Sequence, residues 1–353
     1  MEKIKALKKL VICILIFLII VGGFVCVMDP FYVYHAPLGG QETVLYDRDY
    51  QMPGTIRNFK YDTVILGSSV AENFDSEYVD EYYNANTIKI IRASGSVADL
   101  LYYMNAAHDE NKIKQVFWCL DIFALTSSTQ TTFQNNEELN YLHTKSPLDD
   151  ITYLYNKDIL MEEIPLSLAY SVMDINTGGQ AYNWAADKDF SAAGAMRAYS
   201  KPQTVASEAD YSNELQLLNE NLALVVNEIK EHPDTEYIIM FPPYSMMWWD
   251  CGYVNGIGDL YLEVLEETLS VLCTLDNAKV YFFQDERDIV CNLDNYMDMI
   301  HYSPDINQYM LECVVKEERR VTSDNVEEVL GNMKDTYQYI INEGIYIYYP
   351  KEE

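Results

Sequence analysis

The chain has 353 residues, of which 49% are hydrophobic and 22% charged, as in an ordinary folded globular protein. This length suggests one large domain or two small ones. The net charge is -31; residues 1–28 hold four lysines and one glutamate, so the rest carries 20 basic and 54 acidic side chains. Because nucleic-acid binding depends on neutralising phosphates, this charge excludes nucleic acid as a partner.

The N-terminal segment predicts a membrane anchor. Residues 10–28 contain no charged side chain, and 19 apolar residues are enough to cross the hydrocarbon layer as a helix. Four lysines precede this run and Asp29 follows it, which predicts a cytoplasmic segment 1–9 and a C-terminal bulk on the outer side. The alternative is a cleaved signal peptide, but the run is longer than a usual signal core and no A-x-A site follows it.

Beyond the anchor, residues 29–60 are rich in Pro, Gly and Tyr and predict a stalk that packs on the domain. Short β-rich runs then alternate with segments of helical spacing. We expect strands at 63–66, 87–91, 115–120, 237–241 and 279–283. Helices are expected at 70–82, 96–108, 150–162, 208–231, 257–274 and 324–342, the last with Ser323 as its N-cap.

This alternation predicts an α/β fold with three α/β/α layers and a mainly parallel, five-stranded sheet. The main domain is expected at 61–320, with a polar, turn-rich insertion at 122–205 over the sheet edge and a helical extension at 321–353. In such sheets ligands bind at the carboxyl ends of the strands. The motifs described below all follow predicted strands.

Gly67-Ser68-Ser69 lies between the first strand and the following helix. A nucleophilic serine needs a sharp turn that lifts its hydroxyl from the sheet, and it gains from helix N–H groups that favour an oxyanion. Gly67 permits such a turn and Ser69 stands at the helix start. The competing interpretation is an ordinary N-cap serine.

Asp298-Met299-Ile300-His301 follows the last strand. A general-base histidine needs a carboxylate on its other ring nitrogen, and an Asp three residues earlier on a loop can supply it. Ser303 as N-cap and Pro304 as first helical residue would hold that loop. The competing interpretation is a surface loop histidine.

The two motifs together resemble the SGNH/GDSL hydrolase superfamily. In that family the nucleophile closes a G-D-S motif after the first strand, and the catalytic Asp and His form D-x-x-H near the C-terminus. The resemblance covers about 62–315. It implies Ser69 as nucleophile, Asp298 as acid and His301 as base, with the N–H groups of Ser69 and Gly95, from Ser94-Gly95-Ser96, in the oxyanion hole.

One position departs from the family pattern. The family places an oxyanion-donating Asn after the third strand, whereas this chain has Asp121. An ionised carboxylate only accepts hydrogen bonds. Either Asp121 is structural or supports the site from behind, or another group donates to the oxyanion, or the site is altered. Ser68 stands where the motif has Asp.

The layout of an anchor, the stretch from Asp29 to His35 and an outward domain resembles the anchored partners of membrane-bound O-acyltransferases, such as teichoic-acid D-alanylation and alginate acetylation proteins. By that resemblance Ser69 carries an acyl group to a cell-envelope polysaccharide or teichoic-acid-like polymer, beside a multi-spanning O-acyltransferase. Ester hydrolysis is the same chemistry with water as acceptor. A degenerate domain that only binds glycan or scaffolds a partner, and an unrelated anchored α/β binding domain, are the alternatives.

No cofactor is expected, and no CxxC or His/Cys pairing indicates a metal site. Pro242-Pro243-Tyr244-Ser245 and Met246-Met247-Trp248-Trp249 follow the fourth strand. These side chains are candidates either for stacking on sugars and lining an acyl pocket, or for plain core packing.

Overall fold

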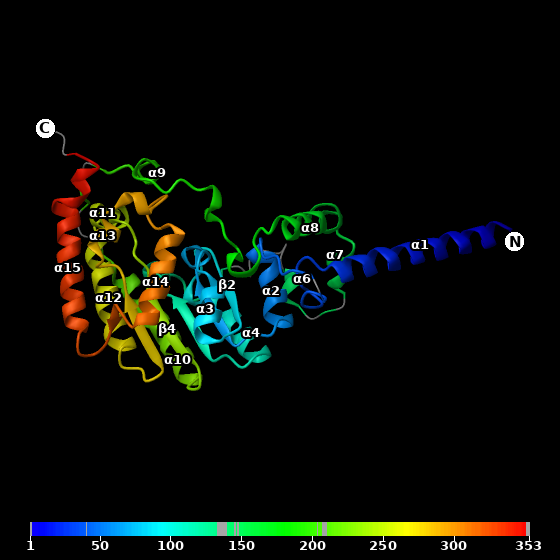
Figure 1. Ribbon diagram of the computed structural model, residues 1–353, viewed down its shortest axis with the longest axis horizontal. Coiled ribbons are helices and arrows are strands. Elements are labelled where there is room, and N and C mark those ends of the chain that lie inside the picture. The colour runs from blue at the N-terminus through cyan, green and yellow to red at the C-terminus, as the bar shows by residue number, and fades with distance from the viewer. Residues whose placement is uncertain are drawn as a thin grey trace. The chain divides into compact units, whose positions relative to one another are not determined.

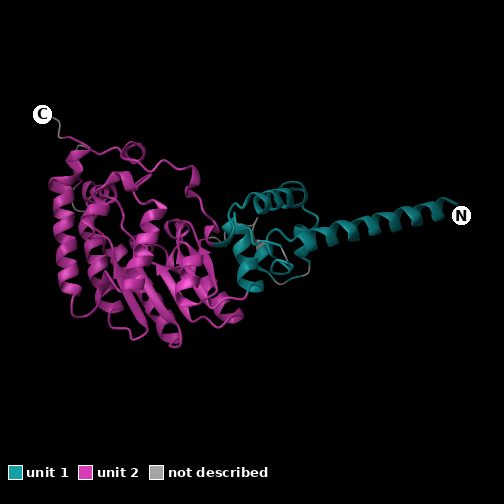
Figure 2. Cartoon of the chain, viewed as in Figure 1, with its two compact units in different colours: residues 1–59, 134–178 teal, residues 60–133, 179–353 magenta. Residues whose placement is uncertain are grey.

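A computed structural model describes residues 2–39, 41–132, 140–144, 146, 148–202, 204–206 and 210–350. The chain divides into two compact units (Figure 2). Unit 1 combines residues 1–59 with 134–178, and unit 2 combines 60–133 with 179–353.

Unit 2 combines helices with a sheet (Figure 1). The sheet has six strands in the order β2-β1-β3-β4-β5-β6. The five strands β1 to β5 are parallel, and their inner residues are almost all buried, which explains their continuous apolar sequence runs. The sixth strand, β6, is a two-residue antiparallel pairing on β5. The strands are β1 Thr63–Gly67, β2 Thr87–Ile91, β3 Gln115–Cys119, β4 Glu236–Phe241, β5 Ala278–Phe282 and β6 Arg320–Val321.

Local signals set the helices of unit 2. A capping box between Ser96 and Asp99 begins α4, and Pro304 is the first residue of α14. Helix α10 buries Leu218, Leu222 and Val225 at helical spacing. The main helices are α3 Ser76–Tyr83, α4 Val97–Glu110, α10 Ser212–Glu231, α11 Met246–Val254, α12 Gly258–Leu272, α14 Pro304–Lys316 and α15 Val326–Asn342. The shorter ones are η1 Ser69–Ala71, α5 Ile122–Leu125, η6 Ala185–Asp187, α9 Ala192–Met196, α13 Arg287–Val290, η7 Leu293–Asn295 and η8 Gly344–Ile347.

Unit 1 is helical and contains the N-terminal apolar helix α1, Glu2–Met28, which is long and apolar enough to cross a membrane. The C-terminal end of α1 packs into a small core through Val25, with Phe31, Tyr153 and Ile164 among its other members. The remaining elements are α2 Arg48–Asn58, α6 Asn140–His143, α7 Asp150–Leu154, η4 Ile159–Glu163, α8 Ile164–Met173 and η5 Gly178–Gln180, which crosses into unit 2.

Several sequence expectations need correction. The sheet has six strands, because β6 falls at the start of the expected helical extension. Helix α15 is preceded by Asn325 as N-cap, whereas the Ser323 hydroxyl donates to the Cys273 carbonyl. The expected helix 70–82 is split into η1 and α3, and the expected helix 150–162 into α7 and η4.

The domain division also differs from the expected stalk and insertion. Residues 29–59 pack with 134–178 in one unit, and residues 179–205 belong with the sheet. Parts of the expected segments lie outside the described residues, namely 1 of the cytoplasmic segment, 40 of the stalk, 133–139, 145, 147 and 203 of the insertion, 208–209 of the helix 208–231, and 351–353 of the extension.

Candidate functional site

The turn after β1 presents Ser69 at the carboxyl end of the sheet. Gly67, the last residue of β1, leaves no room for a side chain, because an added Cβ would lie 2.8 Å from Ala71 Cβ and 3.0 Å from the Cys119 carbonyl oxygen. Ser69 then opens η1, whose first N–H groups have no acceptor within the helix. Ser68 is buried, whereas Ser69 is partly exposed.

The polypeptide beside Ser69 is held by α14 and by the residue after His301. The Val70 carbonyl accepts hydrogen bonds from Asn307 Nδ2 at 2.9 Å and from the Tyr302 hydroxyl at 3.3 Å. Both donors are buried. These two bonds fix the Ser69 turn against the segment that carries the histidine, although the two lie more than 200 residues apart in sequence.

Ser69, His301 and Asp298 form a continuous hydrogen-bonded row. Ser69 Oγ lies 2.8 Å from His301 Nε2, and His301 Nδ1 lies 2.7 Å from Asp298 Oδ2. The other Asp298 oxygen accepts the backbone N–H groups of Ile300 and His301, at 2.9 and 2.8 Å. The sequence predicted that these three side chains lie close together, and the structure brings them together. Their catalytic roles stay predictions.

Asp298 is suited to remain ionised. Burial alone would raise its pKa, but the hydrogen bonds and charge of His301, with the backbone N–H of Ile300, outweigh burial and hold the pKa below its ordinary 3.8. An ionised carboxylate on Nδ1 fixes the tautomer in which Nε2 is free to accept the serine proton. It also stabilises the imidazolium that would follow.

The Asp298–His301 loop is anchored to the segment after β4. The Ser245 hydroxyl donates to the Met299 carbonyl at 2.8 Å, and the Tyr296 hydroxyl donates to the Pro243 carbonyl at 2.9 Å. The Met297 N–H closes the loop onto the His301 carbonyl at 3.0 Å. The loop histidine is thus held by packing and hydrogen bonds on both sides.

Trp184 is a site residue that the sequence analysis missed. Its indole N–H donates to the Ser69 carbonyl at 3.0 Å, and its ring meets the His301 ring edge-on, with centroids 5.2 Å apart. It comes from the irregular segment after Gly179, where no motif marks it. The available signal was a tryptophan in a segment that also carries Tyr182 and Phe190.

Lys89 holds the start of that segment in place. This lysine of β2 is buried, and its ammonium donates to the carbonyls of Glu72 at 2.7 Å, Ala181 at 2.7 Å and Gly179 at 3.2 Å. Glu72 follows η1 directly. Lys89 therefore ties the segment that carries Trp184 to the turn that carries Ser69.

Asp121 lies behind the site, at the end of β3. Its side chain is buried and accepts a hydrogen bond from the Tyr244 hydroxyl. Burial raises the pKa of Asp121 to about 6, while the hydroxyls of Tyr244 and Ser68 and the charge of His301 oppose that rise. A carboxyl with this pKa is partly protonated in mildly acidic solution and can then donate a hydrogen bond, unlike the fixed carboxylate expected from the sequence.

Gly95 has a different environment from that expected. Its N–H donates to the Arg92 carbonyl at 2.9 Å, and Ser94 before it has a left-handed backbone, with φ of 51°. An added Cβ on Gly95 would lie 2.8 Å from Arg92 Cβ, so the tight turn accounts for the glycine. In this conformation the Gly95 N–H is engaged within its own turn.

The segment 242–249 is core. Tyr244, Met246, Met247 and Trp249 are fully buried, and Trp248 is 9% exposed. Trp248 stacks on Tyr261 of α12. These side chains do not form an exposed sugar-stacking surface, and the core-packing interpretation applies.

Comparisons with known proteins add no family to this picture. Neither the scan of protein-family models nor the searches of curated proteins and of solved structures found a match to the chain.

Proposed function

We propose that this protein is a membrane-anchored serine O-acyltransferase or esterase of the SGNH type, with a three-layer, flavodoxin-like domain acting outside the cytoplasm. The row from Ser69 through His301 to Asp298 is the observation that carries the proposal. The strand order β2-β1-β3-β4-β5 supports it, because this is the flavodoxin-like order and Ser69 follows β1, at the β1/β3 switch point where ligands bind in such sheets.

The chemistry follows from the geometry. Ser69 Oγ attacks the acyl carbonyl while His301 Nε2 takes its proton; the donor's ester bond breaks and the leaving alcohol receives that proton. A sugar hydroxyl then attacks acyl-Ser69, His301 accepts its proton and returns it to Ser69. Water in place of the sugar makes the same reaction a hydrolysis. The acceptor proposed is a cell-envelope polysaccharide or teichoic-acid-like polymer.

A degenerate SGNH domain that binds glycan or scaffolds a membrane O-acyltransferase is the second candidate. Two observations favour it. The Gly95 N–H already has an acceptor, and Asp121 stands where the family has an oxyanion donor. Both concern the oxyanion hole, so the experiment must measure reactivity of the serine itself.

The test is labelling of the full-length protein in detergent by a fluorophosphonate probe. We expect Ser69 to be labelled, and Ser69→Ala and His301→Gln to lose the label. Ser68→Ala is the matched control, because it removes the neighbouring buried hydroxyl and should keep the label. A folded wild-type protein that resists the probe would rule out the catalytic proposal and leave the scaffold.

The membrane location is part of the proposal. Helix α7 packs on α1, where Tyr155 donates to the Leu18 carbonyl at 3.2 Å. Downstream, Met161, Leu168 and Val172 are 70%, 49% and 88% exposed, and Pro165 between them is also exposed. Their spacing forms one apolar stripe along η4 and α8, which belong to the same unit as the anchor. Such a stripe fits a lipid surface or a multi-spanning acyltransferase partner better than water.

A further inference from the structure

Two histidines and a glutamate meet at the end of the sheet opposite to the end that carries Ser69. His108 lies near the end of α4, and Glu228 and His232 lie one turn apart at the end of α10. Both helices end just before strands β3 and β4 begin, so this cluster is at the amino ends of the parallel strands. The sequence predicted no metal site, because the two histidines are 124 positions apart and no local spacing connects them.

The donor atoms are close enough to share one ion. His108 Nε2 lies 3.1 Å from Glu228 Oε1, and His232 Nε2 lies 3.8 Å from Glu228 Oε2. One donor atom from each of the three residues lies within 4.8 Å of the donor atoms of the other two. Ligand atoms around a tetrahedral zinc ion, at about 2.0–2.1 Å from the metal, are about 3.3 Å apart. Closure onto an ion thus requires shifts of an ångström or so.

One ring must turn before both can bind the same ion. The two imidazole rings stack with centroids 3.5 Å apart and an angle of 2° between their planes, whereas an imidazole binds a metal in the plane of its own ring. Neutral imidazole is the form that binds metals. The Tyr237 hydroxyl donates to Glu228 Oε1 at 2.8 Å and fixes the carboxylate from behind, as supporting residues do in metal sites.

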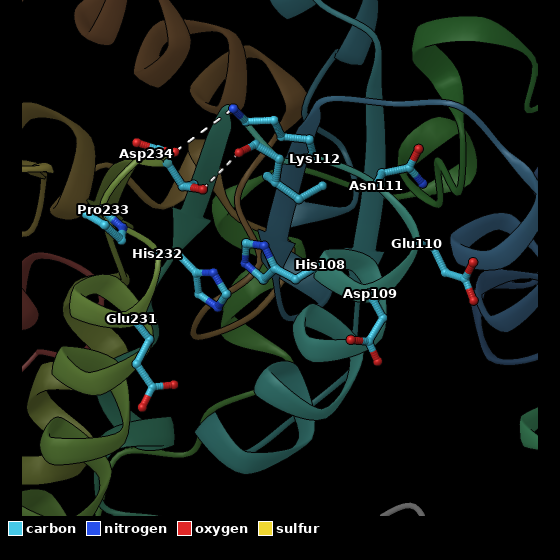
Figure 3. A pocket seen from close by; sticks show the side chains of 11 residues that line it. His108, Asp109, Glu110, Asn111, Lys112, Glu231, His232, Pro233 and Asp234 are labelled. Carbon is cyan, nitrogen blue, oxygen red and sulfur yellow. Dashed lines mark hydrogen bonds and ion pairs between the residues drawn. The ribbon is translucent and has the colours of Figure 1, made fainter.

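Two of the three residues, His108 and His232, line a pocket of about 510 Å³, and Figure 3 shows both rings there. The side chains of His108 and His232 are 12% and 28% exposed, whereas that of Glu228 is 4% exposed. Acidic residues dominate the charge of the lining, and the lining cation Lys112 is 4.0 Å from Asp234. The acidic residues that line the pocket are Asp109, Glu110, Glu231 and Asp234. A cation is therefore attracted to the pocket, and water can complete its coordination.

We propose that His108, Glu228 and His232 bind one Zn²⁺ ion. Two imidazoles and a carboxylate are a ligand set that zinc accepts, with a fourth position left to water. The ion would join the ends of α4 and α10, which pack against each other, and would stabilise unit 2. The site is separate from Ser69, so this proposal stands whether or not the serine is reactive.

The experiment is calorimetric titration of the chelator-stripped, full-length protein in detergent with ZnCl₂. We expect one equivalent to bind, and Glu228→Gln and His232→Gln each to weaken binding at least 100-fold. Glu220→Gln is the matched control: it makes the same change of charge at an exposed position of the same helix, outside the pocket, and should bind zinc as the wild type does. Zinc should raise the melting temperature of the wild type and of Glu220→Gln only.

Circular dichroism without zinc checks that the variants fold. If Glu228→Gln fails to fold, His232→Gln decides the matter, because its partly exposed ring is the least buried of the three. A wild-type protein without saturable binding at one equivalent would overturn the proposal. Zinc binding by folded His232→Gln with the wild-type affinity would overturn it as well.

Discussion

At the scale of single residues, the site contains two carboxyl groups whose pKa values are shifted in opposite directions. Hydrogen bonds keep the pKa of Asp298 low despite burial, whereas burial raises that of Asp121 to about 6. Separate environments for two carboxyls are typical of sites that divide structural and chemical roles. Asp298 is suited to orient His301, and Asp121 is suited to switch between accepting and donating.

Asp121 gives a prediction for stability against pH. Since its folded-state pKa is raised from 3.8 to about 6, the carboxyl takes up a proton on folding between these values. Stability therefore falls as pH rises through this window, by up to about 3 kcal/mol, and stays reduced above it. Asp121→Asn keeps an acceptor for Tyr244 and removes this loss.

The measurement is the free energy of unfolding by urea, for wild type and Asp121→Asn, from pH 4 to pH 8. We expect the variant to gain on the wild type as pH rises from 4 to 6, and the difference to stay level thereafter. Parallel profiles would show that Asp121 ionises in the folded protein as it does in water.

Trp184 gives a second prediction at this scale. Trp184→Phe removes the hydrogen bond to the Ser69 carbonyl but keeps an aromatic ring beside His301, and Trp184→Ala removes both. One lost hydrogen bond is worth about 1 kcal/mol, so Trp184→Phe should slow fluorophosphonate labelling about fivefold. Loss of the ring contact as well should slow it tenfold or more with Trp184→Ala. Equal rates in both variants and the wild type would assign Trp184 to packing alone.

At the scale of elements, continuous apolar runs predicted all five parallel strands, because strands buried on both faces leave that signature. The motifs of Ser69 and His301 each follow a predicted strand. Because the carboxyl ends of parallel strands lie at the same end of the sheet, the sequence also predicted that these two side chains lie close together. The two-residue β6 has too short a pattern to detect. Contacts of Lys89 and Trp184 join an irregular segment to the sheet over about 90 to 115 positions, and no local spacing encodes such packing.

The stripe on η4 and α8 exposes large apolar side chains, which we expect to be covered by another surface. If the bilayer covers it, a photoreactive benzoylphenylalanine at Val172 should crosslink to labelled lipid when the full chain is reconstituted in vesicles. Asp174, exposed at the C-cap of α8 and away from the stripe, is the control position and should crosslink weakly. Equal lipid crosslinking at both positions would leave the stripe to a protein partner.

At the scale of the whole molecule, the charge distribution and the anchor predict the compartment in which the proposed chemistry takes place. Helix α1 begins among four lysines, and the residues beyond it carry a net charge of -34. Basic residues are retained on the cytoplasmic side, so the sheet unit with Ser69 should face the envelope. A protease added to right-side-out vesicles should then remove a C-terminal tag and spare an N-terminal tag, with inverted vesicles giving the reverse.

Replacing Lys3, Lys5, Lys8 and Lys9 by Gln should weaken this bias and produce a mixed population, because the orienting charge is lost while the apolar span is kept. A C-terminal tag protected in right-side-out vesicles would place Ser69 in the cytoplasm, away from any envelope polymer, and the proposed acceptor would have to be abandoned even if the serine is reactive.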